Sequence, residues 1–162
     1  MKIFKSRQST EVTVITVGVT AVMVMILLTI IMTGVLISPV VIAVGLLVLI
    51  ILAWFYAHSL DSVSIAEGQL ILRKKMGSEI IPVSDIQRVE RLAFSNLTMT
   101  AGSKGFFGYI GGSMDNSKLM VNDRTKMIRI YTAGKHYTLS CESPESLMAE
   151  IEDAIPAAIE IK

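Results

Sequence analysis

The sequence predicts an α+β fold in which a two-helix transmembrane hairpin precedes a bent antiparallel β-sheet of about seven strands, capped by a C-terminal α-helix. Three observations lead to this class. Residues 12–60 contain no Asp, Glu, Lys or Arg. Residues 61–140 alternate short apolar and polar runs between turn residues, as antiparallel strands do. Residues 143–159 repeat apolar side chains every four positions, which is typical of a helix with one buried face.

The charge-free block is long enough to cross a bilayer twice. A hydrocarbon core needs about 20 helical residues, and residues 12–37 and 40–60 supply 26 and 21. Ser38 and Pro39 suit the start of a second helix, because Ser caps helices and Pro is tolerated at the first helical position. A single continuous helix over this block would be about 73 Å long, far longer than a hydrocarbon core of about 30 Å. We therefore expect two antiparallel spans joined by a tight turn at residues 34–39.

Basic residues on both flanks predict the orientation of the hairpin. Three lie in residues 1–11 and three in residues 73–75, whereas the turn between the spans has none. Because positive flanks favour the cytoplasm, we expect a multi-pass protein of the cell (inner) membrane with both termini cytoplasmic. Trp54 and Tyr56 fit an aromatic belt at the inner end of the second span.

The first span is rich in threonine, at positions 13, 16, 20, 29 and 33. These hydroxyls can bond the carbonyl four residues earlier in the same helix; the alternative is a face for close helix packing in lipid. Neither span contains Asp, Glu, Lys or Arg. Ion paths and proton relays usually depend on such residues, so we do not expect transport.

These boundaries divide the chain into a cytoplasmic N-terminal segment (1–11), a transmembrane hairpin (12–60) and a cytoplasmic domain (61–162). The domain has 12 basic and 13 acidic residues, a balance that argues against nucleic-acid binding. The single cysteine, Cys141, excludes a disulfide framework, and we expect it to be buried. Two histidines are too few for a zinc site, so no metal and no cofactor is expected.

The predicted strands share short apolar runs bounded by turn residues. They cover residues 63–66, 69–75, 79–83, 86–92, 118–121, 126–132 and 135–140. Residues 95–117 are rich in glycine, with aromatic residues between the glycines. No Gly-Lys-Ser/Thr follows this stretch, so it does not match a phosphate-binding P-loop.

The last segment predicts a helix that begins at Ser143 and Pro144. Its apolar stripe over Leu147–Ile159 indicates packing on the sheet, with partner binding as the alternative. Pro156 removes one intrahelical hydrogen bond, so we expect a kink or an end near Ile155.

Three stretches of the domain resemble the small bacterial PH-domain membrane proteins, in which two spans precede a PH-like domain. They are Val63–Glu90 (VSIAEGQLILRKKMGSEIIPVSDIQRVE), Gly105–Val121 (GFFGYIGGSMDNSKLMV) and Tyr137–Ile151 (YTLSCESPESLMAEI). The resemblance implies a PH-like domain over residues 61–162. It implies no particular activity.

The basic run Arg73, Lys74 and Lys75 is the candidate contact for a lipid or another anion, because each basic residue near an anionic membrane contributes about 1 kcal/mol. The alternative is a solvated strand end that only marks topology.

The aromatic residues of the glycine-rich stretch, Phe106, Phe107 and Tyr109, are candidate partner contacts. The alternative is structural, because glycine between such residues often marks a close approach of two backbones.

We expect a non-enzymatic, membrane-tethered interaction or scaffolding module that binds a protein partner, or copies of itself, at the inner leaflet. The alternatives are an anionic-lipid surface sensor that uses residues 73–75 and a small accessory subunit of a larger membrane complex. Catalysis is not expected: Ser113, His136 and Asp115 or Asp123 form a triad in name only, because no nucleophile elbow surrounds any serine.

Overall fold

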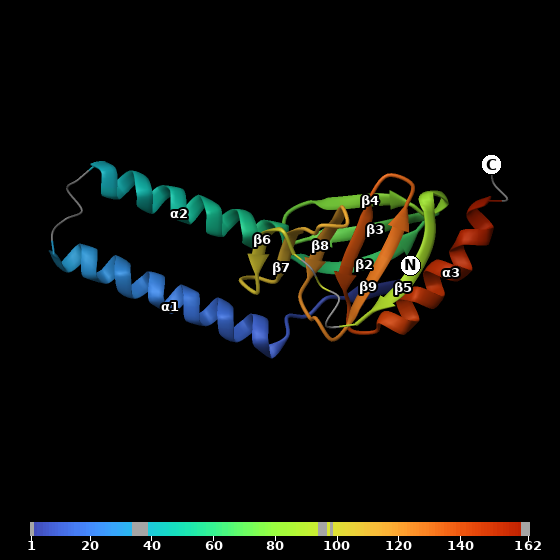
Figure 1. Ribbon diagram of the computed structural model, residues 1–162, viewed down its shortest axis with the longest axis horizontal. Coiled ribbons are helices and arrows are strands. Elements are labelled where there is room, and N and C mark those ends of the chain that lie inside the picture. Colours follow the sequence, from blue (N-terminus) through green and yellow to red (C-terminus); the bar gives the residue numbers. More distant parts are fainter. Residues whose placement is uncertain (1, 34–38, 94–96, 98, 160–162) are drawn as a thin grey trace.

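A helical hairpin extends from one end of a sheet-rich domain in the computed structural model (Figure 1). The structure describes residues 2–33, 39–93, 97 and 99–159. Helix α1 (Thr10–Thr33) and helix α2 (Pro39–His58) form the hairpin. The predicted turn at 34–39 lies, apart from Pro39, outside the described residues.

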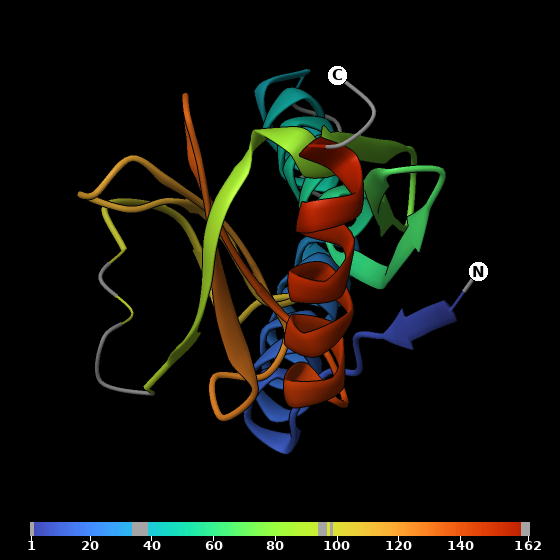
Figure 2. The same ribbon diagram turned by 90° about the vertical axis from the view of Figure 1, so that its right-hand side faces the viewer.

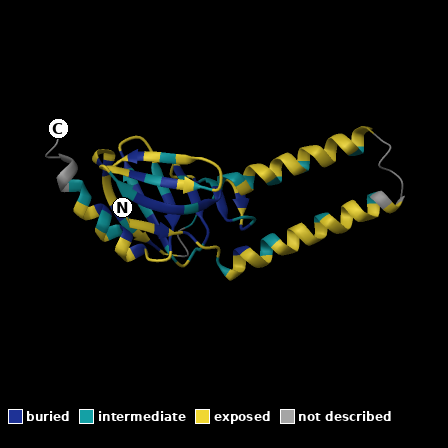
Figure 3. Cartoon of the chain, turned by 180° about the vertical axis from the view of Figure 1, so that it is seen from behind, coloured by how far each residue is buried: buried dark blue, intermediate teal, exposed yellow. Residues whose placement is uncertain are grey.

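Both helices are long and apolar enough to cross a membrane by length and composition. Their side chains are exposed along most of their length (Figure 3). Of the described side chains, none in α2 is buried, and in α1 only Val12 is buried. The prediction that threonines bond their own helix is confirmed at positions 13, 16, 20 and 29, whose hydroxyls donate to the carbonyl four residues earlier.

Four antiparallel strands form the first sheet, sheet A, in the order β1-β2-β3-β4. Their bounds are β1 Lys2–Lys5, β2 Leu60–Ala66, β3 Gln69–Lys74 and β4 Ser78–Pro82. Strand β1 comes from the segment that the sequence analysis placed outside the domain. Its Phe4 is buried in the main core, which explains why this short segment joins the sheet.

Six strands form the second sheet, sheet B, in the order β5-β9-β10-β8-β7-β6. Their bounds are β5 Ile86–Leu92, β6 Ala101–Lys104, β7 Tyr109–Gly112, β8 Ser117–Val121, β9 Met127–Thr132 and β10 His136–Ser140. A short 3-10 turn (Val83–Asp85) leads from sheet A into β5. The predicted fold class is confirmed, with ten described strands instead of about seven. Strands β8 and β10 run parallel, unlike the antiparallel pairing that we predicted.

Helix α3 (Pro144–Ile159) covers the space between the two sheets, on the side away from the hairpin (Figure 2). Leu147 and Ile151 are fully buried in the core shared by both sheets, and Ile155 packs against it. The predicted packing of the apolar stripe on the sheet is therefore confirmed from Leu147 to Ile155, and the side chain of Ile159 lies outside the described residues. We expected a kink or an end near Ile155. The helix does not end there, because it continues past Pro156 to Ile159.

Candidate functional site

Both ends of the helical hairpin meet at one buried side chain, Asn122, which is 2% exposed. Its amide Nδ2 donates to the backbone oxygens of Ser6 (3.2 Å) and Leu60 (2.6 Å). Its backbone oxygen accepts from the N–H of Ser9 at 2.9 Å, and its own N–H donates to Ser140 Oγ at 2.8 Å. Asn122 therefore joins the chain before α1 to the chain after α2. The sequence does not indicate this role, because Asn followed by Asp predicts only a turn.

The glycine-rich turn between β6 and β7 contacts the domain-side ends of both helices (Figure 1). The N–H of Phe107 donates to Thr16 Oγ1 of α1 at 3.0 Å, and its ring lies 5.4 Å from the Tyr56 ring of α2. Gly105 has φ +97°, and a Cβ at this position would lie 2.6 Å from Ile15 Cδ1. The positive φ is a backbone conformation that side chains other than glycine rarely adopt, so glycine suits this position of the turn.

Tyr109 is buried beside this turn, at 7% exposure. Its hydroxyl donates to Glu11 Oε1 at 2.8 Å, and the guanidinium of Arg124 lies 5.2 Å from its ring centroid. Burial, and then the hydrogen bond to Glu11, raise the pKa of Tyr109. Phe106 and Phe107 are half-buried, and their ring centroids lie 4.5 Å apart. These contacts favour the structural alternative, and partner binding through the three aromatic residues stays a prediction.

The three residues of the predicted basic run have different environments. Arg73 is exposed and makes no ion pair within the described part of the chain. Lys74 is 12% exposed in its side chain and pairs with Glu79 at 2.8 Å. Lys75 pairs with Asp61 at 2.5 Å. The run is therefore split between the two faces of sheet A and the turn after β3.

The pairing register of sheet A brings a residue from the N-terminal segment beside Arg73. Lys5 of β1 lies opposite Ser62 of β2, and Ser62 lies opposite Arg73 of β3. Residues opposite each other in a sheet share one face, so the two cations lie in one row. In the sequence, Lys5 and Arg7 indicate only the orientation of the hairpin, and no local pattern places them beside residues 73–75.

This row lines a cavity of about 660 Å³ at the domain-side end of α2, which we call the basic cavity. Four cationic residues and one carboxylate line it, together with two aromatic residues. They are Lys5, Arg7, Arg73, Lys75, Asp61, Tyr56 and Phe107. Arg7 also pairs with Glu142 at 2.9 Å, although its side chain is 76% exposed. The basic cavity therefore suits an anion.

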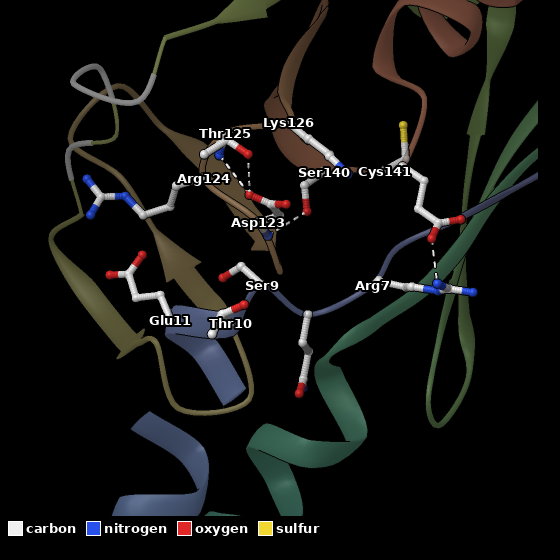
Figure 4. A pocket seen from close by; sticks show the side chains of 12 residues that line it. Arg7, Ser9, Thr10, Glu11, Asp123, Arg124, Thr125, Lys126, Ser140 and Cys141 are labelled. Carbon is white, nitrogen blue, oxygen red and sulfur yellow. Dashed lines mark hydrogen bonds and ion pairs between the residues drawn. The ribbon is translucent and has the colours of Figure 1, made fainter. Parts of the chain in front are cut away.

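A second cavity of about 520 Å³ lies at the start of α1 (Figure 4). Three cationic and three acidic residues line it, so their formal charges cancel and favour neither an anion nor a cation. Cys141 in its wall is 2% exposed, and burial raises the pKa of its thiol to about 11. A thiol of this kind is a poor nucleophile at neutral pH. No group of three or more metal-ligating side chains occurs among the residues that the structure describes.

Comparison with known families gives one match over the sheet-rich domain. The model of the bacterial PH domain matches residues 61–155, from β2 into α3, which is more than half of the chain. The comparison with curated proteins gave no match, and the comparison with solved structures gave none. The matched region contains all three stretches on which the sequence resemblance was based. It excludes β1 and the hairpin. The chain therefore belongs to the bacterial PH domain family, with two candidate membrane spans ahead of its domain.

Proposed function

We propose that this protein is a non-catalytic interaction module whose hairpin crosses the membrane and whose PH-like domain binds a protein partner, or a second copy, at the inner leaflet. The observation that carries the proposal is an exposed apolar row on the outer face of sheet A. Ile3 of β1 and Ile80 of β4 are 55% and 54% exposed there. In the strand register, Ser64 of β2 and Ile71 of β3 lie between them, each opposite its neighbour in the row.

The apolar row ends at an unpaired sheet edge. Strand β4 is the last strand of sheet A, so the outward backbone groups of Ser78–Pro82 have no neighbouring strand within the described residues. Sheet edges of this kind accept an added strand from another chain, and alternate side chains then give specificity. Ile80 in the middle of β4 supplies such a side chain.

The junction with the hairpin supports a role at the membrane surface. Asn122 and the β6–β7 turn connect the domain to both helices, so the domain stays next to any membrane that the helices cross. Tethering raises the effective concentration of two membrane-bound partners for each other. The cytoplasmic orientation follows from the basic flanks.

A photo-crosslinking amino acid at Ile80 in the full-length protein tests the proposal in native membranes. We expect a discrete crosslinked product, of twice the chain's mass for a second copy or of another fixed mass for a different partner. The control is the same crosslinker at Glu152, which is exposed on α3 and therefore lies outside the strands of sheet A. Absence of any discrete product from position 80, or equal products from both positions, would count against binding at this edge.

A further inference from the structure

We propose that the basic cavity binds the head group of an anionic phospholipid from the leaflet that the domain faces. This inference rests on the part of the proposed function in which the hairpin crosses the membrane. It does not depend on a protein partner. Three features of the cavity support it: its charge, its depth relative to the helices and its aromatic wall.

The charge of the cavity is only partly neutralised by the protein. Lys5 and Arg73 make no ion pair within the described part of the chain. The single lining carboxylate, Asp61, is paired with Lys75. Two cations in one row thus remain for an external anion, and hydrogen bonds between cationic side chains and phosphate are among the stronger ones in proteins.

The cavity lies where lipid head groups would be. Helix α2 has 20 residues, which corresponds to about 30 Å and matches the hydrocarbon thickness of a bilayer. Tyr56 and Ser59, which line the cavity, lie at the last residues of α2 and just beyond it. If α2 spans the hydrocarbon, the cavity is at the level of the phosphates.

The wall of the cavity favours a lipid over a soluble phosphate. Tyr56 and Phe107 are aromatic, and tyrosine is enriched at the head-group level of membranes. From Tyr56, the surface continues along exposed apolar side chains of α2 on which acyl chains can lie. A soluble anion makes no use of this surface, and basic pockets beside cytoplasmic helix ends suit anionic lipid head groups.

The only tryptophan of the chain, Trp54, provides the test. It lies two residues before Tyr56 and is 49% exposed. The full-length protein is placed in phosphatidylcholine nanodiscs that contain a small, equal fraction of either brominated phosphatidylglycerol or brominated phosphatidylcholine. We expect the anionic lipid to quench Trp54 fluorescence more strongly than the zwitterionic one.

Variants identify the cations that hold the lipid. Lys5→Gln together with Arg73→Gln should weaken the preference for the anionic lipid roughly fivefold for each cation. Lys5→Arg with Arg73→Lys should keep most of it, which shows that the charges act and not a change of fold. The matched control is Lys135→Gln, which removes an exposed lysine in the turn between β9 and β10, outside the cavity.

Each other outcome overturns a stated part of the inference. Equal quenching by the two lipids, or a preference that the double Gln variant keeps, would contradict the lipid site. Loss of the preference in inorganic phosphate, but not in chloride of equal ionic strength, would assign the cavity to a soluble phosphate. No quenching by either lipid would contradict membrane insertion itself. Crosslinking at Ile80 is measured independently of the lipid quenching. Failure of the lipid site and failure of the protein-binding edge therefore give different results.

Discussion

At the scale of single residues, Asn122 bonds the chain on both sides of the hairpin. Asn122→Ala removes the amide that donates to Ser6 and Leu60 and leaves both carbonyls without this donor. Unpaired buried groups are costly, so we expect a loss of about 1–3 kcal/mol in the free energy of unfolding. Urea unfolding of the detergent-solubilised protein, followed by circular dichroism, measures it. The control is Gln69→Ala, at an exposed position of β3. A loss no larger than that of the control would contradict the role of Asn122.

The candidate site could be predicted only in part, because its residues are distant in sequence. Arg73 and Lys75 were predicted as anion contacts from one basic run, and both line the basic cavity. Lys5 was not included, since only the strand register places it beside Arg73. Lys74 is in the same run, yet it points to Glu79 and does not line the cavity. Successive side chains of a strand point to opposite faces of the sheet, so charges that are adjacent in the sequence can lie on different faces.

At the scale of elements, the contact between α1 and the β6–β7 turn can be tested with two threonines of one helix. Thr16 and Thr20 both donate to the carbonyl four residues earlier, but only Thr16 also accepts the N–H of Phe107. Thr16→Val should therefore raise the hydrogen-exchange rate of the β6–β7 turn about 2–10-fold, the equivalent of ~0.5–1.5 kcal/mol. Mass spectrometry of peptides from residues 101–112 measures it. Thr20→Val is the matched control and should leave the rate unchanged. Equal rates in both variants would contradict the contact.

Elements with strong local patterns were predicted well, and elements that depend on distant pairing were not. The hairpin followed from a charge-free block, and α3 from a four-residue repeat. Strands β6 and β7 were missed because each contains glycine, which is uncommon in strands. Gly102 lies opposite Gly111, and a Cβ on Gly102 would be 2.0 Å from the oxygen of Ile110. Strand β1 was missed because only Phe4 among its four residues is buried. So short a strand has no alternation that a sequence can show.

At the scale of the whole molecule, the hairpin replaces a turn in sheet A. Strands β1 and β2 are antiparallel neighbours, and the N–H of Ser6 donates to the oxygen of Asp61 at 2.9 Å. Neighbouring strands of this kind are usually joined by a loop of about 2–5 residues. Here residues 7–59 make the same connection. The domain is therefore formed from both sides of the hairpin, and β1 belongs to its sheet.

This arrangement predicts that the domain without the hairpin is much more stable when β1 is kept than when it is removed. A chain in which a linker of about four residues replaces residues 7–59 can close the β1–β2 connection. We expect it to unfold cooperatively in urea, followed by far-ultraviolet circular dichroism. A chain that begins at Leu60 lacks β1 and the buried Phe4, which is 6% exposed in the core. Loss of a buried phenylalanine costs about 3–5 kcal/mol, so its unfolding midpoint should be much lower. Equal midpoints would show that β1 adds nothing to the domain, and the domain would then begin at β2.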